Sequence, residues 1–384
     1  MVRRWLTGLL FALAVLTVGS VAWKSNRIGR FAPLVALLSG VTALAACTSV
    51  SASSLRQPYH AAAAPSAVAK AARSVGPGGT NVVRVVAPGT APLPGPAALL
   101  PFPGTTAAYR DLGLWQPAGR LVAGKPAVYE TLLVPPGDTK RAGIAWMDTS
   151  LLSARLYSGS LSPGGGPYKY TAPVAPAAAG SLVAAFNGGF KMKDAHGGYY
   201  TEGRMIRPLV HGAASLVIYA DGAVTIGAWG SDVTMTPSVV AVRQNLYPLV
   251  AGGEPTARAS TRTWRVWGGT CPCGRGLHGT DQQWRSGLGV TADGALVYVV
   301  GPGLTPPQVA DLLVRAGAVR GMELDINPSW PVFAAFKPAT PGGLAAPSNG
   351  VPLIDTSRGP ATFFDPRYNR DFITMSAWPV PGSR

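Results

Sequence analysis

Short apolar runs, separated by glycine, proline and aspartate, dominate the chain from Tyr109 onward. Runs of this length between turn-forming residues are typical of strands, because a helix needs a longer stretch with a period near 3.6. The pattern therefore predicts a domain built mainly from strands. The predicted strands are Val128–Val134, Gly143–Met147, Leu182–Phe186, Ser215–Tyr219, Val224–Ile226, Val239–Val242, Gly287–Thr291, Leu296–Val300, Val319–Leu324, Ala361–Phe364 and Phe372–Met375.

Asp-Gly pairs in Tyr219–Val224 and Thr291–Leu296 predict hairpin turns. One helix is predicted between Thr305 and Gly317, because Thr305 can cap its start and two prolines suit its first turn. Its apolar face consists of Val309, Leu312, Leu313 and Ala316. The fold class expected for residues 106–384 is a single α+β domain with a large mixed or mostly antiparallel sheet and few helices.

Residues 1–47 indicate export or a membrane anchor. Two apolar runs, Leu6–Trp23 and Phe31–Ala46, are joined by a basic segment, and the first is about long enough to span a bilayer. The second ends in Leu-Ala-Ala-Cys at Cys47, which resembles a bacterial lipobox with Cys47 as the lipid-bearing residue. A compact lipoprotein signal over 24–47 and a simple N-terminal anchor both stay open. Either places the rest of the protein outside the cytoplasm, attached to the membrane.

Residues 48–105 are rich in alanine, proline, glycine and serine, which predicts a disordered, partly extended linker. The net charge is +16, but residues 1–105 contain nine of the 33 lysines and arginines and no acidic residue. The folded part is therefore only modestly basic, and no basic run with interleaved aromatic residues occurs in it. We expect no nucleic-acid partner, whereas an anionic substrate fits this charge. The oligomeric state is left open.

Two cysteines, Cys271 and Cys273, lie close to His278. A structural metal site usually has a second such pair, which is absent, so a local disulfide or a loop feature is expected outside the cell. No cofactor or metal site is predicted, although a divalent metal stays open.

Three polar clusters interrupt the apolar runs. They contain Asn187, Gly188 and Gly189, followed by His196, Glu202 and Arg204; then Arg243 and Asn245; and finally Arg285 with Asp325, Asn327 and Trp330. The glycines after the apolar run Leu182–Phe186 allow close approach of a ligand or a plain turn.

The order of five segments resembles the phosphodiester glycosidase family. These segments are AAFNGGF, EGR, GAASLVIYADGAVTIG, RSGLGVTADGALVYVV and PPQVADLLVRAGAVRGMELD, and the resemblance extends from Val128 to Met375. VAVRQNLYPLV together with LDINPSW resembles a bacterial branch of the family. The family commonly continues Leu-Asp with Gly-Gly-Gly-Ser, whereas Asp325 is followed here by the bulkier Ile326-Asn327-Pro328, which bears on the substrate.

The resemblance implies cleavage of a sugar C1–O bond whose other side is a phosphodiester, in a phosphorylated glycan or glycoconjugate. The transition state resembles an oxocarbenium ion, so a carboxylate near C1 stabilises it or attacks it. A phosphate leaving group needs cations more than it needs a general acid. Asp325 is the first candidate for the catalytic carboxylate and Glu202 the second. The predicted substrate-binding residues are Asn187, Gly188, Gly189, Arg204, Arg243, Asn245, Arg285, Asn327 and Trp330, with Arg243 and Arg285 as the phosphate ligands.

Two alternatives remain. The domain could be a non-catalytic binder of wall glycans or teichoic-type polymers, which the altered loop after Asp325 supports. It could also be a structural envelope lipoprotein, in which case the polar clusters are turns and should not converge in space.

Overall fold

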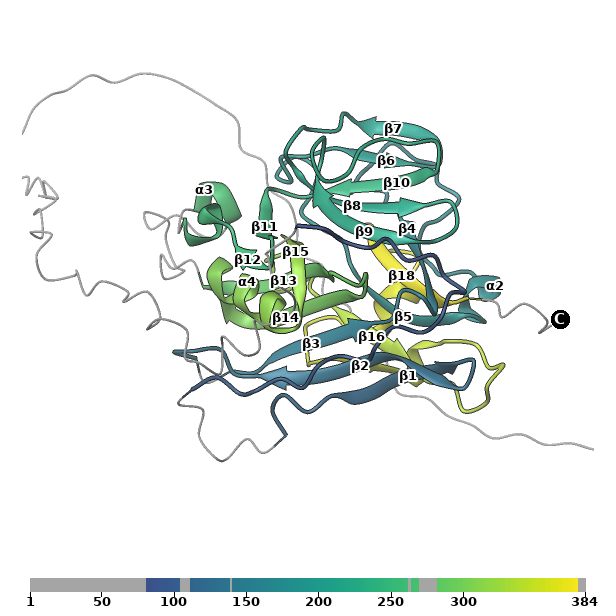
Figure 1. Ribbon diagram of the computed structural model, residues 1–384. Coiled ribbons are helices and arrows are strands. Elements are labelled where there is room, and N and C mark those ends of the chain that lie inside the picture. Colours follow the sequence, from purple (N-terminus) through teal and green to yellow (C-terminus); the bar gives the residue numbers. More distant parts are fainter. Residues whose placement is uncertain (1–80, 104–110, 139, 262–263, 269–281, 379–384) are drawn as a thin grey trace, which may run out of the picture. The chain divides into compact units, whose positions relative to one another are not determined.

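The computed structural model describes residues 81–103, 111–138, 140–261, 264–268 and 282–378 (Figure 1). The predicted signal region 1–47 with Cys47, and the segment with Cys271, Cys273 and His278, lie outside these residues. Within the described part, no helix is long and apolar enough to cross a bilayer.

Three antiparallel sheets form the domain, where the sequence predicted one. The largest has eight strands in the order β1-β2-β3-β14-β13-β15-β11-β12. Their bounds are β1 Gln116–Val122, β2 Lys125–Leu133, β3 Ala142–Met147, β14 Leu296–Leu304, β13 Gln283–Thr291, β15 Ala318–Glu323, β11 Pro248–Ala251 and β12 Glu254–Pro255.

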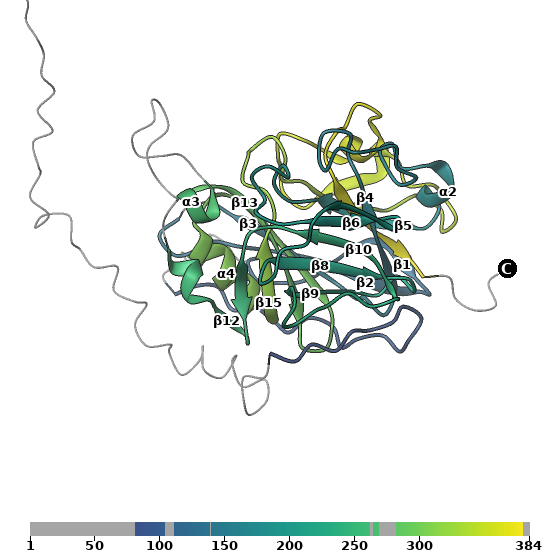
Figure 2. The same ribbon diagram turned by 90° about the horizontal axis from the view of Figure 1, so that it is seen from above.

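The two other sheets have five strands each. One has the order β7 (Arg204–Arg207), β6 (Tyr199–Thr201), β10 (Val239–Gln244), β8 (Ala214–Tyr219) and β9 (Val224–Ala228). It is the teal sheet of Figure 2. The other has the order β17 (Gly350–Pro352), β16 (Phe333–Phe336), β5 (Leu182–Asn187), β18 (Phe372–Ala377) and β4 (Leu152–Tyr157).

All three sheets contribute to one hydrophobic core. Met147 of β3, Phe186 of β5, Leu216 of β8 and Met322 of β15 belong to the same cluster of buried side chains. The sheets therefore form a single cooperative unit, which agrees with the predicted single domain.

The predicted helix is α4 (Pro306–Arg315), and its capping is confirmed. The Thr305 hydroxyl accepts from the Gln308 N–H, and the Gln308 side chain accepts from the Thr305 N–H. The buried face packs on β13, β14 and β15. The remaining short helices are α2 (Pro176–Ala179), α3 (Trp264–Trp267) and the 3₁₀ turns η1 (Ala257–Ser260), η2 (Pro347–Asn349) and η3 (Pro360–Phe364).

Both predicted hairpins are confirmed, as β8–β9 and β13–β14. The predicted strand Ala361–Phe364 is wrong, because this stretch belongs to the 3₁₀ turn η3, which Pro360 begins. A proline with a fixed φ suits the first position of a helical turn.

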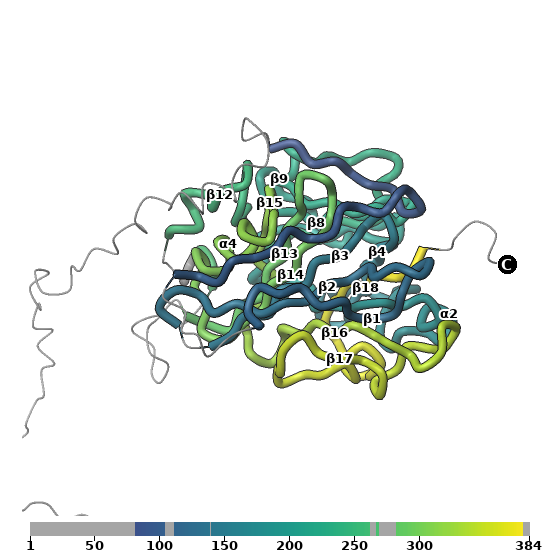
Figure 3. Tube along the Cα trace, turned by 60° about the horizontal axis from the view of Figure 1, so that its bottom comes forward, coloured from purple at the N-terminus to yellow at the C-terminus, as the bar shows by residue number. Residues whose placement is uncertain are grey.

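Residues 81–103 belong to the predicted linker 48–105, yet they pack on the domain. Val86 and Phe102 are buried, and the Arg84 N–H donates to the Ala292 carbonyl at 2.9 Å. In Figure 3 this purple segment runs along the domain. Its backbone is extended, as expected from its composition, but its apolar side chains fix it to the core.

Candidate functional site

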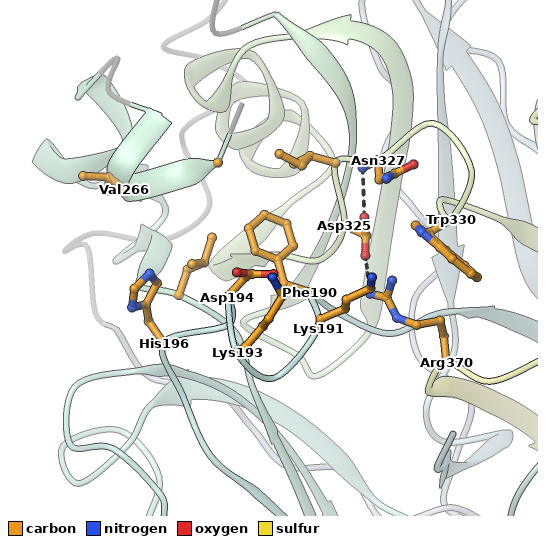
Figure 4. Close-up of a pocket in the computed structure, with 13 residues that line it drawn as sticks. Phe190, Lys191, Lys193, Asp194, His196, Val266, Asp325, Asn327, Trp330 and Arg370 are labelled. Carbon is orange, nitrogen blue, oxygen red and sulfur yellow. Dashed lines mark hydrogen bonds and ion pairs between the residues drawn. The ribbon is translucent and has the colours of Figure 1, made fainter. Parts of the chain in front are cut away.

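A pocket of about 380 Å³ lies where the chain leaves β5 and β15 (Figure 4). Polar and aromatic side chains from distant parts of the sequence meet in it. Its lining consists of Phe190, Lys191, Lys193, Asp194, His196, Leu246, Val266, Gly268, Asp325, Ile326, Asn327, Trp330 and Arg370. Three predicted site residues, Asp325, Asn327 and Trp330, therefore line one pocket.

The Asp325 carboxylate is fixed by two hydrogen bonds (Figure 4). Its Oδ2 accepts from Arg370 Nη2 at 2.7 Å, and its Oδ1 accepts from the Asn327 N–H at 2.9 Å. The side chain is 5% exposed. Burial raises the pKa of Asp325, while Arg370 and the Asn327 amide act in the opposite direction. The pocket thus contains one held carboxylate beside a guanidinium group.

Arg370 is a site residue that the sequence analysis missed. Its Nη2 also donates to the Gly189 carbonyl at 2.8 Å, and its guanidinium carbon lies 4.7 Å from the centroid of the Trp330 ring. The guanidinium carbon of Arg358 lies 4.3 Å from the same centroid. Trp330 therefore packs against guanidinium groups and helps to hold Arg370 in place. The available signal was the charged pair Arg370-Asp371 directly before the apolar run of β18.

Two exposed lysines, Lys191 and Lys193, also line the pocket and were not predicted. Lys193 Nζ lies 3.7 Å from the Asp194 carboxylate, in an exposed pair that contributes little to stability. With Arg370, the pocket has three cationic side chains against the two carboxylates of Asp194 and Asp325. An anionic ligand fits this balance.

The amide of Asn187 lies behind the pocket and serves the framework. Its Oδ1 accepts from the Tyr298 hydroxyl at 2.6 Å and from the Val332 N–H at 3.1 Å. Its Nδ2 donates to the Gly188 carbonyl at 2.7 Å and to Ser286 Oγ at 3.0 Å. All four hydrogen-bonding positions of the amide are used within the protein, and Asn187 does not line the pocket, so its contact with substrate stays a prediction.

Gly188 and Gly189 are also buried and are required by packing. A Cβ at Gly188 would lie 2.3 Å from Asp371 Oδ2, and one at Gly189 would lie 2.6 Å from Asn245 Oδ1. These glycines make room for a polar framework of the protein itself. Of the two, Gly189 contributes to the site through its carbonyl, which holds Arg370.

That framework includes Arg243, which was predicted to bind phosphate. Its Nε donates to Asp371 Oδ2 at 2.8 Å, its Nη2 donates to the Phe190 carbonyl, and it is 1% exposed. Asn245 accepts from the Phe190 N–H at 2.9 Å and donates to the Glu323 carbonyl at 2.8 Å. Asn245 therefore connects the strand end before Asp325 to the pocket wall at Phe190, and Arg243 connects Asp371 to the same wall.

Arg285 forms the second buried ion pair, with Glu323. It donates to the Glu323 carboxylate and, through Nε, to the Leu304 carbonyl at 2.9 Å. Burial raises the pKa of Glu323 to about 7, although Arg285 opposes this. Neither Arg243 nor Arg285 lines the pocket, so their direct contact with phosphate stays a prediction without support from this geometry.

Glu202 and Arg204 lie elsewhere. Glu202 lines a second pocket, and its carboxylate accepts from the Lys169 and Tyr170 N–H groups at 3.0 Å each. Arg204 is exposed and donates to the Pro167 carbonyl at 2.8 Å. Glu202 and Asp325 therefore line different pockets, and the catalytic role of Glu202 stays a prediction. Within the described residues, no group of three or more His, Cys, Asp or Glu side chains could hold a metal ion.

Comparison with known proteins bears on the same region. Residues 180–325 match the model of the phosphodiester glycosidase family. No curated protein sequence matches the chain. Among solved structures, the catalytic domain of zebrafish N-acetylglucosamine-1-phosphodiester alpha-N-acetylglucosaminidase, auto-inhibited by pro-peptide, is 16% identical, with a TM-score of 0.39 over 68% of this chain and 87% of that one. A hypothetical protein from Synechocystis is 11% identical, with a TM-score of 0.36 over 66% and 63% of the two chains.

The family match begins in the segment that leads into β5 and ends at Asp325, so it includes β5, β10 and β15 but not Asn327, Trp330 or Arg370 of the pocket. Over residues 180–325 the chain is therefore similar to the phosphodiester glycosidase family.

Proposed function

We propose that this protein hydrolyses a sugar C1–O bond to a phosphodiester-linked group, at the pocket that contains Asp325. The observation that carries the proposal is the held carboxylate of Asp325 beside the guanidinium group of Arg370, in a pocket with a cationic excess. The family match over residues 180–325 supports the reaction class.

Asp325 has the environment that a carboxylate near C1 needs. Both of its oxygens are oriented by N–H donors, so the charge is placed before substrate arrives. In the reaction, this charge stabilises the positive character that develops at C1 as the C1–O bond breaks. A water molecule then supplies the new oxygen at C1.

We assign to Arg370, Lys191 and Lys193 the role of binding the departing phosphate. Arg370 uses Nη2 for its hydrogen bonds to Asp325 and to the Gly189 carbonyl. A guanidinium group has five N–H donors, which leaves Nη1 for the phosphate. The two lysines add exposed charge at the same pocket. Because a phosphate monoester leaves without being protonated, the second carboxylate of an ordinary glycosidase is not needed here.

We further propose that the protein is exported and attached to the membrane through residues 1–47. The apolar runs, the lipobox-like ending at Cys47 and the linker composition support this proposal. The substrate would then be a phosphorylated glycan or glycoconjugate of the cell envelope or its surroundings.

The test uses the full-length chain, because residues 81–103 pack on the domain. A panel of sugar-1-phosphodiesters is incubated in ¹⁸O-water, and the products are analysed by mass spectrometry. Hydrolysis at C1 places the label on the sugar, whereas cleavage at phosphorus places it on phosphate. Asp325→Asn should abolish turnover, and Arg367→Met, at an exposed residue that lines neither pocket, should retain it. Full activity of Asp325→Asn, or label on phosphate, would refute the proposal.

A non-catalytic glycan binder is the second candidate, and the separation of Glu202 from Asp325 favours it. Asp325 is the one buried carboxylate among the described residues that line the pocket, which could then hold a phosphorylated glycan without breaking it. Saturable binding of the panel that depends on Arg370, without turnover of any member, would identify this function.

A further inference from the structure

The pocket at Glu202 is distinct from the site at Asp325 and larger, with a volume of about 490 Å³. Its lining comes from β4, from the β6–β7 and β8–β9 turns, from β10, and from single residues of two other segments. β4 contacts β8, which belongs to a different sheet, and the two lie close together in Figure 1. The cleft therefore lies at the junction of the two five-stranded sheets.

Four aromatic side chains converge on this cleft from four different parts of the chain. They are Tyr170, Tyr200, Tyr219 and Trp378, and each is partly exposed. Flat aromatic faces bind the apolar faces of pyranose rings, while hydroxyl groups and the indole N–H bind sugar hydroxyls. Such a concentration of partly exposed rings indicates a ligand with ring faces and many hydroxyl groups.

The two pockets differ in the net charge of the side chains that line them. Here Arg155 is accompanied by the carboxylates of Glu202 and Asp221, so the excess is one negative charge. The guanidinium carbon of Arg155 lies 4.1 Å from the centroid of the Tyr170 ring, which occupies part of its surface. A phosphorylated ligand is therefore disfavoured in this cleft, and an uncharged one is favoured.

Hydrogen bonds fix the cleft at both ends. At one end, the Glu202 carboxylate accepts from the Lys169 and Tyr170 N–H groups, and Glu202 itself adopts φ 51°, which a non-glycine residue rarely does. At the other end, the Ala154 N–H donates to the Gly222 carbonyl at 2.9 Å. The walls are thus positioned before a ligand binds, which lowers the entropic cost of binding.

β4 is the edge strand of its sheet, and an edge strand can pair with an added peptide strand. The β8–β9 turn already occupies this edge, because the Gly222 carbonyl accepts from the Ala154 N–H of β4. Gly222 also packs closely on Ser153, since a Cβ at Gly222 would lie 2.0 Å from Ser153 Oγ. This contact blocks strand addition and leaves the side-chain surface for the ligand.

We propose that this cleft binds an uncharged oligosaccharide, as a glycan-binding site separate from the pocket at Asp325. The proposal extends the proposed function, since the cleft would hold the part of a glycan that does not react. It does not depend on that function, because binding can be measured without turnover.

Isothermal titration calorimetry of the full-length chain with four uncharged probes tests the proposal: the hexasaccharides of β-1,4-glucose, α-1,4-glucose, β-1,4-N-acetylglucosamine and α-1,6-mannose. At least one should bind saturably. Tyr200→Leu and Tyr219→Leu keep apolar volume but remove the ring face, so each should weaken binding by about tenfold or more. Tyr168→Leu is the matched control, because Tyr168 packs against Arg204 outside the cleft.

Asp325→Asn separates this inference from the proposed function. Binding of the uncharged probe should be unchanged in Asp325→Asn even where turnover of phosphodiesters is lost. The inference is overturned if none of the four probes binds, or if binding survives the double Tyr200→Leu and Tyr219→Leu change in a protein with wild-type thermal stability. It is also overturned if only phosphorylated oligosaccharides bind, or if an unstructured peptide binds in their place.

Discussion

Replacing Arg370 by methionine should destabilise the protein strongly at neutral pH and much less in acid. Arg370 and Asp325 form a buried pair with 4% and 5% of their side chains exposed. Removing one partner leaves an uncompensated buried charge, which costs about 3–5 kcal/mol of unfolding free energy. Methionine keeps most of the side-chain length, so the loss of packing is small compared with the loss of charge.

The pH dependence follows from the pKa of Asp325. Burial already raises this pKa above 3.8, and Arg370 is the largest opposing influence, so the pKa rises further in Arg370→Met. A carboxyl group with a raised pKa retains its proton in the folded state after the unfolded chain has released it. Stability therefore falls as pH rises from the unfolded pKa to the folded one, and the variant extends that window upward. The difference between wild type and variant should narrow as the pH is lowered toward 4.

Urea unfolding followed by circular dichroism at pH 4.5 and pH 7.5 measures both effects. The control is Arg367→Met, which breaks the exposed pair between Arg367 and Asp365 and should change stability little at either pH. Equal losses in the two variants, or a loss in Arg370→Met that is the same at both pH values, would show that Asp325 and Arg370 are not a buried charge pair.

Three further changes test the framework. Burial raises the pKa of Glu130 to about 7, so the unfolding free energy of the wild type should fall between pH 4.5 and 7. In urea unfolding, Glu130→Gln should flatten this pH dependence and raise the unfolding free energy at pH 8 by up to about 3 kcal/mol. Gly188→Ala should lower stability by about 1–3 kcal/mol, because its Cβ would meet Asp371, whereas Gly359→Ala, with open space around it, should melt like wild type. Thr305→Ala should cost about 1 kcal/mol in the same unfolding assay through loss of the helix cap, and an unchanged midpoint would refute that role.

Much of the fold was predictable because its signals are local. The Asp-Gly turns and the capped helix depend on residues a few positions apart, and the strands at Leu182 and Leu296 are continuous apolar runs. β4 was missed because its sequence LSARLY contains polar residues in an apolar run. The division into three sheets was missed because it depends on which distant strands pair, and no local pattern encodes that choice.

The candidate site was predictable to a lesser degree. Asp325 was found because it follows a predicted strand in a family motif, and it does line the pocket. The sequence could not show which arginine lines the pocket, because each of Arg243, Arg285 and Arg370 is positioned by a carboxylate that is distant in the sequence. Arg243 is paired with a residue 128 positions away, and Arg285 with one 38 positions away. Sequence spacing contains no information on these contacts.

The pair Arg370-Asp371, directly before β18, shows how the pocket is assembled. Asp371 forms an ion pair with Arg243 and lies so close to Gly188 that a Cβ there would clash with it. The adjacent Arg370 donates hydrogen bonds to Asp325 and to the Gly189 carbonyl. Two consecutive residues of opposite charge thus join the ends of β5, β10 and β15. The Asp371 side chain enters the framework, and the Arg370 side chain lines the pocket. The two glycines after Asn187 are needed for the same reason, since the framework ion pair occupies the space that their side chains would fill.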